Sequence, residues 1–322
     1  MTGRTIPEGG LVFDRTPFDP ARAEGEGLSD TRRSLRTALL LGWRVESNWT
    51  DPVLFVIYTV AKPIASLLLL VVMIQIIGAG GTGQSDETVM SFVVLGSALW
   101  ATIVAGIAGP AWSVIEDRER YRMLKYLYVA PSTFLVLLIG RGSARLLAGV
   151  AGTVVALAFA AVFLGVRIDI ATIAWPLFVT SLVLGIVPIL GIGVLLAAVC
   201  LQTRQESWSY PEAFAGAMFL VSGVVFPLAI LPDPLEWLGL VNPITWWVEG
   251  MRQALLPGSP TAIGGPGSVW TAVTGTSAPD GATIVIALFA TGALATLAAT
   301  AIFRRSEHRA RELGLLDRTT GS

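Results

Sequence analysis

Long stretches without a charged side chain dominate this sequence and restrict what it can fold into. No Asp, Glu, Lys or Arg occurs in 89–115, 146–166, 170–201, 213–232 and 281–303, and Lys62 is the only one in 53–77. A helix needs about 20 apolar residues to cross the hydrocarbon core of a bilayer. Charged residues make up only 14% of the chain, against about 25% in a typical soluble domain. The sequence therefore predicts an all-α membrane protein, whose six transmembrane helices cover 53–77, 89–115, 132–166, 170–201, 211–230 and 281–303.

The positions of the basic residues predict an orientation. If the six spans cross the membrane one after another in alternating directions, only Arg167 and Arg252 among the 22 Lys and Arg residues fall on the side opposite the N-terminus. Short cytoplasmic loops of membrane proteins carry an excess of Lys and Arg. We therefore expect a transmembrane domain over 51–305, a cytoplasmic tail over 306–322 and both termini in the cytoplasm.

The segment before the first span has two parts. Residues 1–28 are rich in Gly, Pro and charge, a composition typical of poorly ordered chain. An amphipathic helix is predicted over 29–50, with Leu35, Leu39 and Trp43 on one face. Such a helix is suited to the headgroup plane of a membrane, and the alternative is a helix packed against the rest of the protein. The residues assigned to this interface helix are Arg32, Arg36, Leu39 and Trp43.

A charged segment at 116–130 follows the second predicted span. Its acidic residues come first and its basic residues later, which favours a helix through the helix dipole. Tyr121, Leu124 and Tyr128 lie near one another on one face of that helix. The helix is suited to a groove on a partner protein, or the segment is a linker whose arginines bind lipid phosphates. The candidate docking residues are Glu116, Arg118, Glu119, Arg120, Tyr121, Leu124, Tyr128 and Pro131.

The segment at 231–256 combines helix-breaking prolines with tryptophans. Trp prefers the membrane interface, so we expect short helices that re-enter the outer leaflet as a hairpin, or a plain aromatic anchor. Glu249 and Arg252 are three residues apart and are placed to pair on a helix face. The residues assigned to this region are Phe226, Pro227, Pro232, Asn242, Pro243, Trp246, Trp247, Glu249 and Arg252.

The candidates for a translocation path are Lys62, Trp100 and Phe219. Lys62 is an ionisable residue inside a span, which is a mark of function in membranes, although its long side chain also suits contact with the inner headgroups. The two aromatic residues are candidates for substrate contact or for lipid anchoring.

Several kinds of chemistry have no support in the sequence. With one cysteine and one histidine, no metal site or histidine-based catalytic triad is expected, and no catalytic residue is assigned. No Gly-x-x-x-x-Gly-Lys-Ser/Thr motif occurs, so ATP is not expected to bind this chain. A membrane-embedded lipid-processing enzyme and a passive membrane scaffold remain the alternatives to a transporter.

Two local patterns add a resemblance to a known family. They are Glu116-Asp117-Arg118-Glu119-Arg120 through Ala130-Pro131-Ser132 with Gly140-Arg141, and Ser222 to Pro227 with Leu231-Pro232, Asn242-Pro243-Ile244-Thr245 and Glu249-Gly250-Met251-Arg252. With these patterns and the order of its helices, the chain resembles the permease subunits of ABC type-2 exporters, which include daunorubicin-resistance and polysaccharide exporters. Arg120-Tyr121 stands where many members have Gly-Thr.

The resemblance implies a function and partners. It implies export of an amphipathic drug, lipid, glycolipid or polysaccharide across a bacterial cell membrane, with 116–130 as the coupling helix. It implies two copies of a cytoplasmic ATPase subunit that bind ATP and Mg, and a second permease chain that completes a homodimer. Membrane lipids are expected as further partners, and nucleic acid is not.

Overall fold

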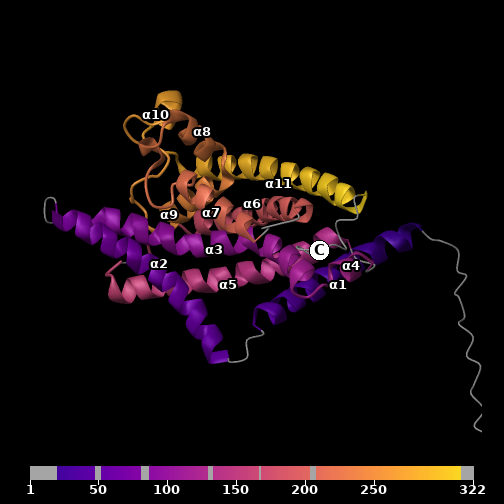
Figure 1. The fold of residues 1–322 in the computed structure, drawn as a ribbon. Coiled ribbons are helices and arrows are strands. Elements are labelled where there is room, and N and C mark those ends of the chain that lie inside the picture. Colours follow the sequence, from indigo (N-terminus) through magenta and orange to yellow (C-terminus); the bar gives the residue numbers. More distant parts are fainter. Residues whose placement is uncertain are drawn as a thin grey trace, which may run out of the picture.

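The computed structural model describes residues 20–47, 52–80, 87–129, 133–166, 168–203 and 208–312, and this part of the chain is helical without strands (Figure 1). The helices are α1 (Pro20–Glu46), α2 (Pro52–Gly80), α3 (Glu87–Glu119), α4 (Leu124–Val129), α5 (Phe134–Phe163), α6 (Trp175–Gln202), α7 (Ser209–Val221), the 3-10 turn η1 (Leu228–Ile230), α8 (Asp233–Val241), α9 (Pro243–Leu255), α10 (Val269–Thr274) and α11 (Gly281–Glu312).

Four helices are long and apolar enough to cross a membrane: Thr88–Arg120, Phe134–Phe163, Trp175–Gln202 and Gly281–Ala310, which belong to α3, α5, α6 and α11. They coincide with four of the six predicted spans. The first predicted span corresponds to α2, whose apolar part in the described residues is Val60–Ile76. The described residues therefore form an all-α fold of the membrane class.

The fifth predicted span, 211–230, is only partly helical. Helix α7 has 13 residues, or about 20 Å at the usual rise, which is shorter than the roughly 30 Å hydrocarbon core. It ends at Val221 because Gly223 adopts a left-handed φ of 63°, and Pro227 then takes an extended conformation before η1. The chain continues as the two short helices α8 and α9, which are joined at Asn242.

Small residues allow the long helices to pack closely around α3, which lies against both α5 and α6. A Cβ atom added at Gly106 of α3 would lie 2.4 Å from Ile189 Cγ2 of α6, and one added at Gly149 of α5 would lie 2.5 Å from Ala105 Cβ. Helix α11 covers the other side of α6. In Figure 1 these helices run side by side, with α8, α9 and α10 gathered at one end and α4 at the other. We call these the α8–α10 end and the α4 end.

The interface helix is longer than expected at its start, because α1 begins at Pro20 and not at 29. The predicted poorly ordered segment therefore overlaps this helix, while residues 1–19 lie outside the described part of the chain. Helix α1 packs along α5 through small side chains: Ala38 is buried, and a Cβ atom at Gly140 would lie 2.5 Å from Ala38 Cβ. Leu35 and Trp43 remain exposed. Packing on the protein and an exposed apolar face thus occur on the same helix.

Candidate functional site

Ionic side chains from three helices meet at the α4 end. We call this group the charge cluster: Glu46 of α1, Glu116 and Asp117 of α3, and Arg141 and Arg145 of α5. Arg145 donates to Glu46 Oε2 and to Glu116 Oε1, both at 2.7 Å. Arg141 donates to Asp117 Oδ2, and its Nη2 lies 3.8 Å from Glu116 Oε2. Arg145 of α5 thus ties α1 to the end of α3, and Arg141 adds a second ionic contact between α5 and α3.

Arg118 connects the same end of α3 to α6. Its Nη1 donates to the carbonyl oxygens of Cys200 and Thr203, each at 2.9 Å, and its Nε donates to Glu119. The last carbonyls of a helix lack partners within the helix and attract cations. Glu116 and Arg118 therefore hold helices of this chain together, although the sequence pattern assigned them to contacts with a partner.

The segment predicted as one helix over 116–130 is divided. Helix α3 continues to Glu119, Arg122 takes a left-handed φ of 51°, and α4 begins only at Leu124. Leu124 is 2% exposed and belongs to the main buried cluster, so a docking role for its side chain does not fit the structure. Tyr128 lies in α4, and Pro131 lies outside the described residues.

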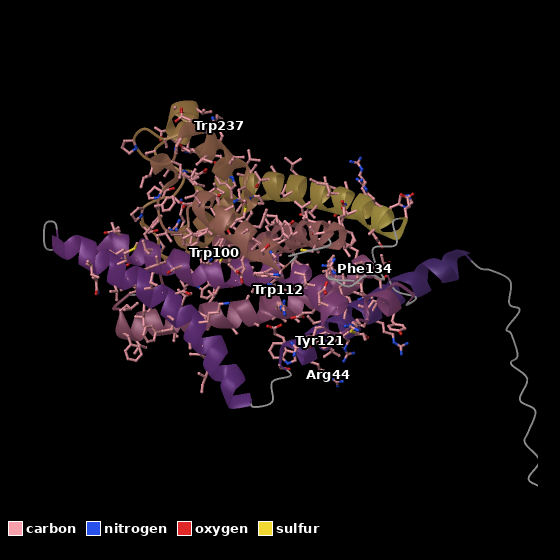
Figure 2. The ribbon with its side chains drawn as sticks, in the orientation of Figure 1. Arg44, Trp100, Trp112, Tyr121, Phe134 and Trp237 are labelled. Carbon is pink, nitrogen blue, oxygen red and sulfur yellow. The ribbon has the colours of Figure 1, made fainter. Side chains whose placement is uncertain are left out.

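What remains on the surface is the turn between α3 and α4. Arg120, Tyr121 and Arg122 are exposed, and the Arg120 guanidinium lies 5.6 Å from the centre of the Tyr121 ring. In Figure 2, Tyr121 and Arg44 are labelled on the side of the molecule away from Trp237. We call these three residues the α3–α4 turn. It presents two guanidinium groups and one aromatic ring at the α4 end, beside the charge cluster.

The residues assigned to the interface helix differ in exposure. Arg32, Arg36 and Trp43 are exposed on α1, while Leu39 is half-buried. Trp43 keeps 44% of its surface accessible. The basic and aromatic side chains thus remain available to an outside partner, while Leu39 is partly covered by the protein.

Asn242 organises the helices at the α8–α10 end. It caps α9 by accepting a hydrogen bond from Ile244 N at 3.1 Å, and its Nδ2 donates to Ser222 Oγ at 2.9 Å. Pro243 occupies the first position of α9, where its missing N–H costs nothing. Trp246 Nε1 donates to Leu240 O at 2.7 Å. These contacts connect α7, α8 and α9 at the point where the sequence predicts a re-entrant hairpin.

The other aromatic and proline residues assigned to this region differ in burial. Trp247 is 1% exposed, and a Cβ atom at Gly185 would lie 1.8 Å from its Cδ1, so α6 accepts the indole only where it carries glycine. Phe226 and Pro227 are half-buried, and Pro232 is exposed. The tryptophans at 246 and 247 are therefore core residues of the fold.

Glu249 and Arg252 form the predicted ion pair, and both side chains are fully buried. Arg252 Nη1 lies 3.2 Å from Glu249 Oε2, and Nη2 donates to the carbonyls of Gly223 and Val224 at 3.1 Å. The guanidinium carbon also lies 3.7 Å from the centre of the Phe92 ring on α3. A single side chain of α9 thus holds the loop that follows α7 against α3.

The partners of Glu249 complete this arrangement. Its Oε2 accepts from Ala262 N at 3.0 Å and its Oε1 accepts from Gln253 Nε2 at 2.8 Å. Glu236 of α8 is also buried and accepts from Val269 N at 2.8 Å. Two buried carboxylates therefore fix the loop after α9 to the short helices.

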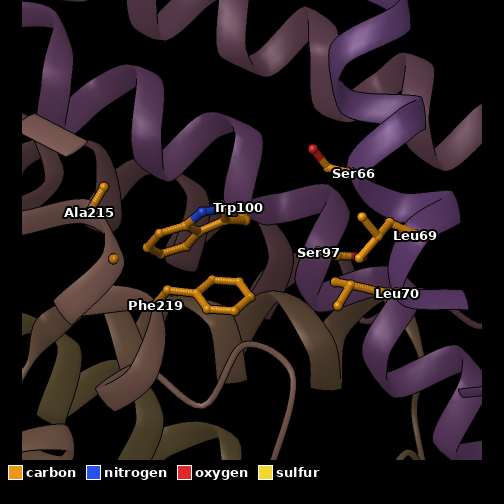
Figure 3. Close-up of a pocket in the computed structure, with 8 residues that line it drawn as sticks. Ser66, Leu69, Leu70, Ser97, Trp100, Ala215 and Phe219 are labelled. Atoms are coloured by element: carbon orange, nitrogen blue, oxygen red, sulfur yellow. The ribbon is translucent and has the colours of Figure 1, made fainter. Parts of the chain in front are cut away.

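A pocket of about 350 Å³ opens between α2, α3 and α7 (Figure 3). Trp100 and Phe219 lie on one side of it with their ring centres 5.0 Å apart in an edge-to-face arrangement. The lining residues are Ser66, Leu69, Leu70, Ser97, Trp100, Ala215, Gly216 and Phe219. The structure thus brings together two of the three residues assigned to a translocation path. Lys62 is exposed on α2 and does not line the pocket.

The charge cluster was only partly visible in the sequence. Arg141 and Arg145 stand four residues apart at the start of an apolar span, and this spacing places them on one helix face. The sequence pattern did not reveal that the acceptors are Glu46, Glu116 and Asp117 of the same chain.

Long apolar helices, a shortened α7 and buried polar contacts around α9 define a multi-pass membrane protein. A model of the ABC-2 type transporter family matches residues 37–256, which is more than half of the chain. The chain therefore belongs to the ABC-2 type transporter family, and it is a permease of this class of transporters. A search among curated proteins finds no match.

Proposed function

We propose that this chain is the membrane subunit of an ATP-driven exporter. Family membership supports a permease, and the sequence carries no P-loop motif, so the energy for transport has to come from a second protein. We assign ATP and Mg to a cytoplasmic ATPase subunit present in two copies, and we assign a second permease chain, as a homodimer, to complete the translocation path. The cargo is an amphipathic drug, lipid, glycolipid or polysaccharide.

The proposed orientation places the α4 end in the cytoplasm of a bacterial cell and the α8–α10 end outside. The distribution of Lys and Arg supports it, because only Arg167 and Arg252 fall on the outer side. In this orientation α1 lies at the inner surface of the cell membrane, with its exposed arginines at the level of the headgroups. The pocket at Trp100 and Phe219 is the candidate for part of the path.

The observation that carries the proposal is the exposed α3–α4 turn. Tyr and Arg are enriched among the residues that dominate protein interfaces, and Tyr121 presents both its own ring and the adjacent Arg120 guanidinium. Behind the turn, the charge cluster and Arg118 join α3 to α1, α5 and α6. A displacement of this turn by an ATPase would therefore be transmitted to several membrane helices at once.

Co-purification tests this assignment. The permease is expressed with a P-loop ATPase subunit of the same genome, and the amount of bound ATPase and its ATP hydrolysis are measured. Tyr121→Ala should weaken the complex about 30-fold, the loss typical of a dominant interface residue. Tyr210→Ala is the matched control, because Tyr210 is 37% exposed and Tyr121 is 38% exposed, and it should leave binding unchanged. A wild-type chain that binds no ATPase, or equal binding by the Tyr121 variant, would contradict the proposal.

A further inference from the structure

The pocket between α2, α3 and α7 has an uncharged lining. Its lining includes the apolar and aromatic side chains of Leu69, Leu70, Trp100 and Phe219, and side-chain polar atoms belong to Ser66, Ser97 and Trp100. The Ser97 hydroxyl donates to Val94 O at 3.0 Å, so its proton is already in a hydrogen bond within the helix. This lining contains no charged residue and is suited to an apolar chain or ring.

A cation lies one helical turn away from the pocket. Lys62 precedes Ser66 by one i, i+4 step on α2, so the two residues share a helix face. Lys62 is exposed, and within the described part of the chain no carboxylate lies within ion-pair distance of it. An ionisable side chain on an otherwise apolar membrane helix is costly unless it finds a partner. An anion at this position would supply that partner.

The order of Lys62 and the pocket along α2 sets the orientation of a bound molecule. Side chains of a helix tilt toward its N-terminus, so the Lys62 ammonium points away from the pocket and toward Pro52, where α2 begins. In the proposed orientation that is the cytoplasmic side. An amphiphile of the inner leaflet has its head on this side and its apolar part toward the bilayer centre, which matches the order of cation and pocket.

We propose that the pocket receives the apolar part of an anionic amphiphile whose phosphate or carboxylate head pairs with Lys62. This inference rests on the proposed export function and narrows the cargo to an acidic lipid or a lipid-like acid of the inner leaflet. The fit comes from charge complementarity: within the described part of the chain Lys62 has no carboxylate partner, and it stands beside a pocket lined without charged residues. A neutral amphiphile would leave Lys62 without a partner, and a zwitterionic one would bring a second cation close to the ammonium group.

Gly216 gives a way to close the pocket without disturbing its walls. Gly216 lines the pocket, and no atom lies within 4 Å of a Cβ atom added at this position, so Gly216→Leu adds a side chain at the pocket without a clash. Ala217 is its neighbour on α7, is exposed and does not line the pocket. Ala217→Leu therefore adds a leucine to the same helix outside the site and serves as the matched control.

Native mass spectrometry of the purified full chain tests the inference without any ATPase. The probes are oleoyl lysophosphatidylglycerol, which is anionic, and oleoyl lysophosphatidylcholine, which is zwitterionic and has the same chain. The wild type should retain the anionic probe about fivefold more than the zwitterionic one, the preference expected from one basic residue near an acidic lipid head. Lys62→Gln should abolish the preference and Lys62→Arg should keep it. Gly216→Leu should lower retention of both probes, and Ala217→Leu should lower neither.

Two results would overturn the inference: equal retention of the two probes by the wild type, or an unchanged preference in Lys62→Gln, which would mean that Lys62 only reaches bulk headgroups. Thermal unfolding of each variant confirms that it is folded. A permease that binds its ATPase but shows no probe preference would refute this inference alone, whereas one that shows the preference but binds no ATPase would refute the proposed function alone.

Discussion

Arg252 shows how a single residue connects distant parts of this chain. Its guanidinium is fully buried between Glu249, the carbonyls of Gly223 and Val224, and the ring of Phe92. Breaking a buried pair by removing one charge is costly, because the other charge stays behind without compensation. The pair therefore specifies one arrangement of α3, the loop after α7 and α9, whatever its net contribution to stability.

Arg252→Leu should lower the free energy of unfolding by about 3–5 kcal/mol, since Glu249 then remains buried without its cation. Replacing both members, as in Glu249→Leu with Arg252→Leu, should cost less than the single Arg252 change. Chemical or thermal unfolding of the three purified variants measures the difference. A double variant that is less stable than Arg252→Leu would show that the two charges do not act as a pair.

The sequence predicted only some of the contacts that Arg252 makes. The spacing of Glu249 and Arg252 predicted their contact because residues three apart meet on a helix, and the structure confirms it. The carbonyl acceptors at Gly223 and Val224 were not predictable, because they belong to backbone freed where α7 ends, and that end depends on a left-handed glycine. The ring of Phe92 comes from a span far earlier in the chain, which no local pattern indicates.

At the scale of elements, α1 and α5 form a contact that needs small residues on both helices. A Cβ atom at Gly140 would lie 2.5 Å from Ala38 Cβ and 3.1 Å from Leu35 O, and one at Gly42 would lie 2.9 Å from Ala144 Cβ. The ion pair between Glu46 and Arg145 closes the same contact near the end of α1. The contact with α5 thus sets the position and the angle of α1, which do not depend on the membrane surface alone.

Gly140→Leu should separate α1 from α5, because the backbone at Leu35 cannot yield to a larger side chain, and overpacking of this kind costs about 1–3 kcal/mol. Hydrogen–deuterium exchange should show faster exchange of the α1 amides, with α6 unchanged. Gly216→Leu is the control, since that position has free space. Unaltered protection of α1 in the Gly140 variant would refute the tight contact described above.

Contacts between elements also explain why the segment at 116–130, which was predicted as one helix, is divided in the structure. Its charge order and its aromatic spacing are those of a continuous helix. In the structure, however, the carboxylates of Glu116 and Asp117 form ion pairs with Arg145 and Arg141 on α5. Burial of Leu124 against the main core then fixes the start of α4. Both effects come from tertiary contacts, so propensity and periodicity within the segment could not reveal the break.

At the scale of the whole molecule, the two ends differ in whether their charged side chains are buried or exposed. The α8–α10 end is built from short helices fixed by buried carboxylates and Arg252, while the α4 end exposes arginines on α1 and on the α3–α4 turn. The long apolar stretches predicted the four helices between these ends because length and hydropathy alone decide them. The shortened α7 was not predicted, since its residues are as apolar as those of a full span.

Cysteine labelling tests the proposed orientation of these two ends. In a background with Cys200→Ser, which removes the single cysteine, a cysteine is placed at the exposed Val273 of α10 or the exposed His308 of α11. A membrane-impermeant maleimide should modify Val273→Cys in intact cells and His308→Cys only after permeabilisation. The reverse pattern would place the α4 end outside and remove the basis for a cytoplasmic ATPase.

The surroundings of Arg252 also bear on how the protein is made. Phe92, Gly223 and Val224 all precede Arg252 in the chain, and chains emerge from the ribosome in sequence order. The aromatic ring and both carbonyl acceptors have therefore been synthesised before the arginine appears, and Glu249 leads it by one helical turn. Arg252 therefore does not depend on any later segment of the chain for the acceptors that the described residues provide.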